Sequence, residues 1–198
     1  SSSVYGGNKK LPFSETDRVD LPVSLYAATK KAGELMSHSY SHLYRLPITG
    51  LRFFTVYGPW GRPDMAAWLF VRAILAGESI QVFNNGDMMR DFTYIDDVVA
   101  GVLAVLDGPP EESNMDAPHR LYNIGNNCPE KLMDFIGLIE DSLEQKAEIE
   151  FKPMQAGDVK ETYADIDAIK SRFGFAPTTR IEEGVPKFIA WYRDYHGL

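Results

Sequence analysis

Hydrophobic and polar positions follow two different periods along the chain, and together they predict an α/β fold. Between Leu25 and Tyr44, apolar or small residues recur every three or four positions, which predicts a long amphipathic helix capped by Ser24. The stripe expected to pack on the core consists of Leu25, Ala28, Ala32, Leu35, Met36, Ser39 and Leu43. The stretch LPITGLRFFTVYGP ends this helix at Pro47 and predicts a mostly apolar strand over about residues 49–57. A helix followed by such a strand is typical of a parallel α/β sheet.

The rest of the chain continues the same alternation. Further helices are predicted over residues 66–78, from Asp96 and Asp97 to Leu106, over about 131–145 and over 182–196, with short strands over 80–83 and 120–126. One of Asp96 and Asp97 is expected to cap its helix.

The opening stretch SSSVYG is interpreted as the carboxyl end of a buried strand. A nucleotide-binding α/β unit begins with a strand, a glycine-rich turn and a helix, and this sequence contains no G-x-G-x-x-G. We therefore expect only the later part of such a unit, with its first half missing.

Composition and charge limit the classes of binding partner that we expect. With 198 residues, 44% of them apolar, the chain can fold around one or two cores. A formal net charge of -8 argues against binding to nucleic acid or to an anionic membrane. Cys128 is the sole cysteine, which excludes an intramolecular disulfide and favours a reducing, cytoplasmic location. No signal peptide or membrane-spanning run is visible.

Two spacings on the first predicted helix suggest chemistry. Tyr26 and Lys30 are four residues apart and so share one face, turned away from the apolar stripe. A nearby ammonium stabilises a phenolate, so Tyr26 is a candidate general base, although a surface pair is the alternative for so short a pattern. His38 and His42 have metal-ligand spacing, but neither the glutamate of a zinc hydrolase nor a third ligand is evident, so no metal site is predicted.

Five motifs occur in a fixed order: SSSVYG, Tyr26-x-x-x-Lys30, LRFFTVYGP, RDFTYIDDV and YNIG. In this order they resemble the extended short-chain dehydrogenase/reductase family, and within it the NAD-dependent nucleotide-sugar epimerases. LRFFTVYGPWGRPDMA is similar to the UDP-glucuronate 4-epimerase branch. The resemblance implies the C-terminal part of a Rossmann-type parallel sheet domain in residues 1–58 and about 95–125. It also implies a smaller mixed α/β substrate-binding domain in residues about 59–94 and 126–198.

The resemblance also implies roles for the residues at the reacting end of the site. Tyr26 would deprotonate the 4-hydroxyl of the sugar, and Ser1, four residues before Tyr5, would share a hydrogen bond with that hydroxyl. Lys30 and Phe54, together with Tyr26, would contact the nicotinamide end of NAD. The implied reaction inverts C4 through a transient 4-keto sugar and regenerates NAD at each turnover.

Ser2 and Ser3 favour epimerisation, because related 4,6-dehydratases carry Asp and Glu at these positions. Hydroxyl groups there, with Thr55, can hold a sugar carboxylate without repelling it, so the implied substrate is UDP-glucuronate and the product UDP-galacturonate.

The remaining implied contacts are to the nucleotide. Arginine suits a diphosphate, and Arg90 and Arg62 are the candidates. Gln81 and Phe83, on one face of a short strand, would meet the uracil. Asp158 would meet the ribose, although Gln155 stands where galactose-type members have arginine.

Several alternatives stay open. The enzyme could be a UDP-glucuronate decarboxylase or another sugar-nucleotide epimerase or dehydratase. Alternatively, the chain could be a noncatalytic nucleotide-sugar-binding fragment, because the expected missing half supplies the phosphate-binding turn. The resemblance further implies a homodimer when the full chain is present, formed partly by the helix that carries Tyr26.

Overall fold

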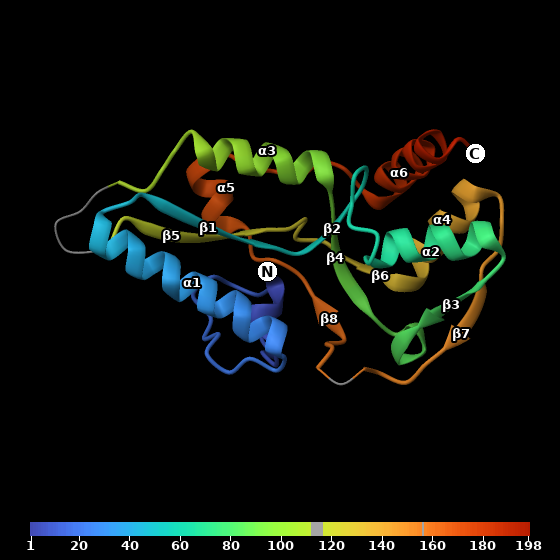
Figure 1. Cartoon of the computed structure of the whole chain (residues 1–198), viewed down its shortest axis with the longest axis horizontal. Coiled ribbons are helices and arrows are strands. Elements are labelled where there is room, and N and C mark those ends of the chain that lie inside the picture. Colours follow the sequence, from blue (N-terminus) through green and yellow to red (C-terminus); the bar gives the residue numbers. More distant parts are fainter. Residues whose placement is uncertain (112–116, 156) are drawn as a thin grey trace.

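The computed structural model describes residues 1–111, 117–155 and 157–198. Its helices and strands form two α/β parts arranged along the long axis (Figure 1). One part holds α1, α3, α5, β1 and β5, and the other holds α2, α4, α6, β3 and β7, with β2, β4, β6 and β8 near the join. The prediction of an α/β fold with parallel strands is confirmed.

The first part is built on two long parallel strands that pair residue for residue. Its elements are η1 (Ser2–Tyr5), α1 (Leu25–Tyr44), β1 (Ile48–Phe53), α3 (Ile95–Leu106), β5 (His119–Ile124) and α5 (Asp167–Phe173). The register runs from Ile48 opposite His119 to Phe53 opposite Ile124, and α1 and α3 flank the strand pair on opposite sides (Figure 1). Its core is a cluster of buried side chains from η1, α3, β5 and the segment 164–175.

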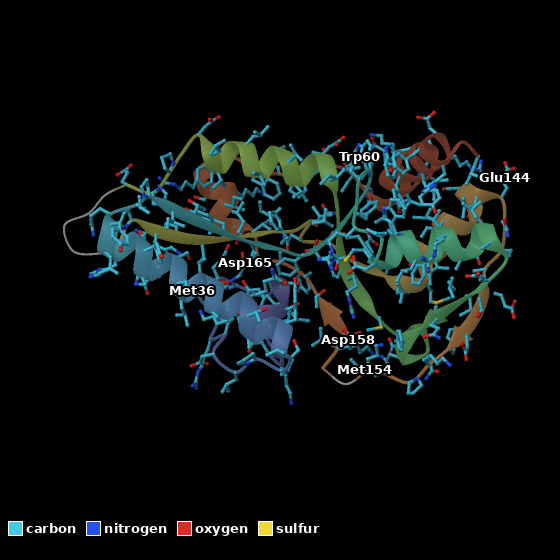
Figure 2. All side chains as sticks on the ribbon, in the orientation of Figure 1. Met36, Trp60, Glu144, Met154, Asp158 and Asp165 are labelled. Atoms are coloured by element: carbon cyan, nitrogen blue, oxygen red, sulfur yellow. The ribbon has the colours of Figure 1, made fainter. Side chains whose placement is uncertain are left out.

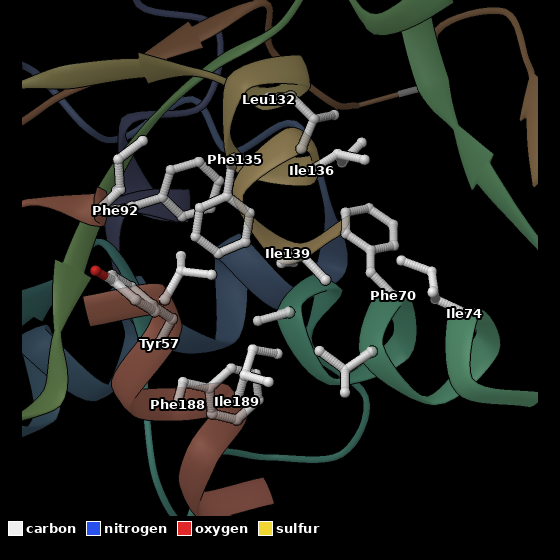
Figure 3. Close-up of a cluster of buried hydrophobic side chains, with 14 of the residues drawn as sticks. Tyr57, Phe70, Ile74, Phe92, Leu132, Phe135, Ile136, Ile139, Phe188 and Ile189 are labelled. Atoms are coloured by element: carbon white, nitrogen blue, oxygen red, sulfur yellow. The ribbon is translucent and has the colours of Figure 1, made fainter. Parts of the chain in front are cut away.

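The second part packs helices against short strands. Its elements are β2 (Thr55–Tyr57), α2 (Ala66–Ala76), β3 (Ser79–Val82), η2 (Phe83–Gly86), β4 (Met89–Tyr94), β6 (Pro129–Lys131), α4 (Leu132–Leu143), β7 (Glu148–Phe151), β8 (Glu161–Thr162) and α6 (Ile181–His196). Strand β4 is central, since it pairs in parallel with β2 and β8 and antiparallel with β6. In the core, the rings of Phe92 and Phe135 stack with centroids 4.0 Å apart, and Tyr57 meets Phe135 edge-on (Figure 3).

The predicted helices are present, and the first long predicted strand is interrupted. Helix α1 has the predicted bounds, and the Ser24 Oγ caps it by accepting the backbone N–H of Ala27 at 3.1 Å. The strand predicted over 49–57 is interrupted at Phe54, because β1 pairs with β5 whereas β2 pairs with β4. One continuous apolar run therefore serves two sheets.

The face of α1 that packs on the protein is not the predicted one. The apolar stripe is largely exposed: the exposed fraction is 83% for Leu25, 57% for Leu35 and 61% for Met36, and Figure 2 shows Met36 on the outer side of the helix. The buried residues of α1 are Ala27 and Ser41. The prediction was wrong because the opposite, more polar face is held on the sheet by specific hydrogen bonds, such as those from the Arg52 guanidinium to the Glu34 carboxylate.

Two local predictions also need correction. Ser2–Tyr5 forms a 3-10 helix rather than a strand, because the Ser1 Oγ accepts the Ser3 N–H and the Gly6 N–H returns to the Ser3 carbonyl. Neither Asp96 nor Asp97 caps α3, whose N-cap is Tyr94. The Asp97 carboxylate instead accepts the backbone N–H groups of residues 178 and 179, which anchors the segment before α6.

Each of the two parts has its own hydrophobic cluster. Residues of the segment 164–175 belong to the cluster of the part that holds β1 and β5. The domain boundaries given above stay a prediction. Within the described residues, no helix combines the length and apolar character needed to cross a membrane.

Candidate active site

A cavity of about 1190 Å³ lies at the join between the two parts, slightly larger than the roughly 300–1,000 Å³ usual for small-molecule sites. All but two of the predicted site residues line it: Ser1, Ser2, Ser3, Tyr26, Lys30, Phe54, Thr55, Arg62, Arg90 and Asp158. Their segments are as much as 157 positions apart in the chain, from Ser1 to Asp158. The structure therefore brings together residues that the sequence only suggested as a set.

The reacting end of the cavity is formed by one face of α1. Tyr26 and Lys30 lie one turn apart, and the Lys30 Nζ is 5.2 Å from the centre of the Tyr26 ring. Tyr26 is 48% exposed, so its hydroxyl is accessible from the cavity. Glu34 and Ser37 continue the same face and also line the cavity. This is the face opposite the exposed apolar stripe.

The serine residues and the β1–β2 junction form the adjacent wall. Ser1, Ser2 and Ser3 are half-buried around η1, which packs against α1. Phe54 is buried at the junction between β1 and β2, and Thr55 follows it at the start of β2. The wall therefore combines neutral hydroxyl groups with one aromatic ring.

Arg90 is held rigidly on the opposite wall, which belongs to the second part. Its Nη1 donates to the carbonyls of Met89 and Lys160 at 2.9 and 3.1 Å, and its Nη2 donates to the Asp158 Oδ1 at 2.9 Å. Burial lowers the pKa of Arg90, and the charge of Asp158 opposes that shift. Asp158, predicted as a ribose contact, lies on the segment before β8 (Figure 2). Its carboxylate forms an ion pair with Arg90.

Arg62 has a looser environment. Its side chain is 67% exposed, and its guanidinium pairs with Asp64 at 3.0 and 2.6 Å. The exposed Trp60, two residues earlier in the same loop, also lines the cavity and contacts Trp191 and Tyr195 of α6. Figure 2 shows Trp60 beside α6. The loop is therefore supported by aromatic contacts, which the sequence reasoning did not identify.

Gln81 and Phe83 are not part of this cavity. Gln81 is exposed on β3, and β3 ends at Val82, so Phe83 belongs to the following η2 turn and packs against the second hydrophobic cluster. Strand β3 ends one residue earlier than predicted, because η2 begins at Phe83. That the side chains of Gln81 and Phe83 share one face stays a prediction. A contact between either side chain and a uracil stays a prediction.

Sequence reasoning also missed a buried polar network beneath the cavity. Arg52 of β1 is 1% exposed, and its guanidinium contacts Glu34 and the hydroxyl of Tyr5. Burial raises the pKa of Tyr5 to about 12, although Arg52 opposes the shift. Burial disfavours the charge of Glu34, but the hydrogen bonds and charges of Arg52 and Lys31 together outweigh this and lower the pKa of Glu34. The available signal was an arginine within the otherwise apolar run LRFFTVY.

The lining at the α1 end fits one end of a dinucleotide. A phenol, an ammonium and serine hydroxyls can bind the hydroxyl groups of a ribose, and the Phe54 ring offers an apolar surface for a nicotinamide. Among the described residues, no three His, Cys, Asp or Glu side chains are grouped so that they could hold a metal ion.

The fold and the cavity define a class: an α/β protein of Rossmann type whose ligand site lies at the ends of parallel strands. The profile of the NAD dependent epimerase/dehydratase family matches residues 1–125. The chain belongs to this family, so the predictions of the family and of its NAD dependence are confirmed.

Similar proteins carry more specific names. Protein CapI of Staphylococcus aureus is 51% identical over 207 residues, which cover 99% of this chain and 62% of that protein. UDP-glucuronate 4-epimerase 1 of Arabidopsis thaliana is 50% identical over 207 residues, covering 100% of this chain and 48% of that protein. The chain thus spans between about half and three fifths of these relatives.

A solved structure shares the fold. UDP-glucuronic acid 4-epimerase from Bacillus cereus, in complex with UDP-glucuronic acid and NAD, superposes with a TM-score of 0.87 at 33% sequence identity. The match covers 98% of this chain and 60% of that chain.

Proposed function

We propose that the whole protein containing this chain is an NAD-dependent nucleotide-sugar 4-epimerase that interconverts UDP-glucuronate and UDP-galacturonate. The observation that carries the proposal is the shared lining of one cavity by the serine residues, the Tyr26 and Lys30 pair and Arg90. The names of relatives with about 50% identity support the choice of substrate.

The residues have complementary roles in this proposal. NAD would be held by Tyr26, Lys30 and Phe54, and when bound it would supply reversible hydride transfer at C4 of the sugar. Tyr26 takes the proton of the 4-hydroxyl and gives it back, while the nearby ammonium of Lys30 stabilises the phenolate. Ser1 donates or accepts a hydrogen bond at the same oxygen.

The hydroxyl groups beside Tyr26 favour epimerisation over elimination. Ser2, Ser3 and Thr55 can donate hydrogen bonds to a sugar carboxylate, and none of them is a strong acid or base at neutral pH. Retention of that carboxylate also distinguishes the proposal from the alternative of a UDP-glucuronate decarboxylase, or of a dehydratase that needs an acid and base pair.

Arg90 is proposed to bind the diphosphate. Two backbone carbonyls fix one nitrogen of its guanidinium, so the side chain is already ordered in the cavity wall. Preordering of this kind reduces the entropy lost when a ligand binds. A bound diphosphate would compete with Asp158 for the other guanidinium nitrogen of Arg90. Once displaced, the Asp158 carboxylate would be available for its second proposed role, the contact with the ribose.

The direct experiment is product analysis. The whole protein is incubated with UDP-glucuronate and NAD, and the nucleotide sugars are separated by chromatography. UDP-galacturonate is the expected product, whereas carbon dioxide with a UDP-pentose would identify a decarboxylase. Tyr26→Phe should abolish turnover and leave UDP binding intact. Tyr40→Phe is the matched control, because Tyr40 is also an exposed tyrosine of α1 but does not line the cavity.

A second candidate is a noncatalytic nucleotide-sugar-binding protein. It is favoured by Arg90 and Asp158, which are already in place in the cavity wall. Calorimetry of the 198-residue chain with UDP and with NAD separates the cases. Binding of UDP alone supports this candidate, and tight binding of NAD contradicts it.

The exposed apolar stripe of α1 supports a homodimer as the proposed assembly, because a large apolar surface on a helix is usually covered in a protein complex. The cytoplasm is the proposed compartment, since a sole cysteine suits a reducing environment.

A further inference from the structure

We propose that Glu34, Arg52 and Tyr5 form a positioning network that fixes the Tyr26 and Lys30 face of α1 relative to the serine residues of η1. The inference rests on the proposed function, because the groups that it positions are the proposed catalytic groups. None of the three side chains has a part in the chemistry described above.

The first contact joins α1 to β1. Glu34 lies one helical turn after Lys30 and two turns after Tyr26, on the same cavity-lining face. Both of its carboxylate oxygens are bound by Arg52, from Nε at 2.7 Å and from Nη2 at 2.9 Å. Such a two-point contact restricts both the distance and the orientation of the helix on the strand.

The second contact joins β1 to η1. The remaining Arg52 Nη1 donates to the Tyr5 hydroxyl at 3.0 Å, and the guanidinium carbon lies 5.0 Å from the centre of the Tyr5 ring. Tyr5 is the last residue of η1, the turn that follows Ser1 and contains Ser2 and Ser3. One guanidinium therefore binds both elements that carry the proposed catalytic residues.

The network continues to a fixed point in the sheet. The Tyr5 hydroxyl donates to the Asn123 Oδ1 at 2.6 Å, and Asn123 stands opposite Arg52 in the parallel register of β1 and β5. The Asn123 amide in turn donates to the carbonyls of Phe13 and Asp165 at 2.8 and 3.0 Å. Each polar side chain of the network is hydrogen-bonded to another member, so the side chains have few alternative geometries.

General packing does not account for this arrangement. Burial of a charged pair is costly, and apolar residues of similar volume often stabilise a fold equally well. Here the buried face of α1 contributes little apolar surface, since its buried residues are Ala27 and Ser41. The position of the helix therefore depends on directional contacts, and a displacement of about 1 Å at reacting groups can reduce a rate by about a hundredfold.

The experiment compares Glu34→Gln, Tyr5→Phe and Arg52→Lys in the whole protein. Arg52→Lys retains the charge but not the two-point contact. The matched control is Glu140→Gln on α4, because Glu140 and Glu34 have the same 12% side-chain exposure and each pairs with a cation, while Glu140 does not line the cavity.

The expected result is a fall in kcat of about a hundredfold for Glu34→Gln and about tenfold for Tyr5→Phe and Arg52→Lys, with KM and the Kd for UDP changed by less than about twofold. Glu140→Gln should retain kcat. An unchanged kcat in both Glu34→Gln and Tyr5→Phe, or an equal loss in Glu140→Gln, would overturn the proposal.

A second measurement separates this proposal from the proposed function. If the wild-type protein does not convert UDP-glucuronate, the epimerase assignment fails, and hydrogen exchange still tests the network. Tyr5→Phe should accelerate amide exchange about tenfold in residues 1–6 and 25–31, with α4 and α6 unaffected. Exchange at the wild-type rate in both segments would show that the network positions nothing.

Discussion

Asp91 connects three separate segments around Arg90, and its substitution offers a stringent test of the structure. Its carboxylate is fully buried. The Oδ1 accepts the backbone N–H of Asn126 at 2.5 Å and the Thr93 hydroxyl at 3.1 Å, and the Oδ2 accepts the N–H groups of Asn127 and Ala164 at 3.1 and 2.9 Å. We predict that Asp91→Asn destabilises the protein although it conserves the size of the side chain.

The magnitude follows from these contacts. An asparagine has one oxygen and one NH2 group, so the NH2 must face at least one of the backbone N–H groups, which then loses its partner. Each buried donor without a partner costs about 1–3 kcal/mol, and the amide can orient so that only the Asn126 N–H is left without one, so the expected loss is about 1–3 kcal/mol. For a chain of this length, that loss corresponds to a fall in Tm of roughly 2–12 °C.

The assay is thermal unfolding at pH 7, followed by circular dichroism. Asp97→Asn is the control, because Asp97 also accepts two backbone N–H groups but is only half-buried, so its loss should stay below about 1 kcal/mol. A Tm for Asp91→Asn within about 1 °C of the wild type, or equal losses for the two variants, would refute the reasoning.

Three further predictions concern charge, ligand and assembly. Because the pKa of Glu34 is lower in the folded state, its ion pair with Arg52 contributes stability above the ordinary pKa of about 4.5, and that contribution is lost as the pH falls through the folded-state pKa. In urea titrations, the free energy of unfolding of Glu34→Gln should therefore fall less at acid pH than that of the wild type. An identical fall in the two proteins would contradict this sign. Arg90→Gln should weaken UDP binding at least about tenfold by calorimetry, whereas Arg62→Gln should weaken it less; the reverse order would exclude Arg90 as the main diphosphate ligand. If the whole protein forms the proposed homodimer, Leu35→Glu on the exposed stripe of α1 should convert it to a monomer in sedimentation measurements, and an unchanged dimer would place the interface elsewhere.

The positions of the main elements were predictable from the sequence, because hydrophobic period and capping residues are local signals. Helix α1 has its predicted bounds and cap for this reason. The use of each face was not predictable, because an apolar stripe has the same pattern whether it covers a core or another protein. The exposure of Leu35 and Met36 shows that the stripe of α1 does not pack on the described core.

The candidate site was only partly predictable for a related reason. The motifs identified the residues that line the cavity, but the pairing of Arg90 with Asp158 and the contact of Arg52 with Tyr5 join residues that are distant in sequence.

The interruption at Phe54 has a thermodynamic consequence. Tyr26 is carried by a helix on the β1 and β5 pair, whereas Arg90 belongs to β4, whose neighbour Phe92 is part of the other hydrophobic cluster. A single molecule that contacts both residues would bind only when the two clusters are folded and correctly apposed. Its binding free energy would then add to the cooperativity between the two clusters, so that a saturating ligand would raise the Tm of both together.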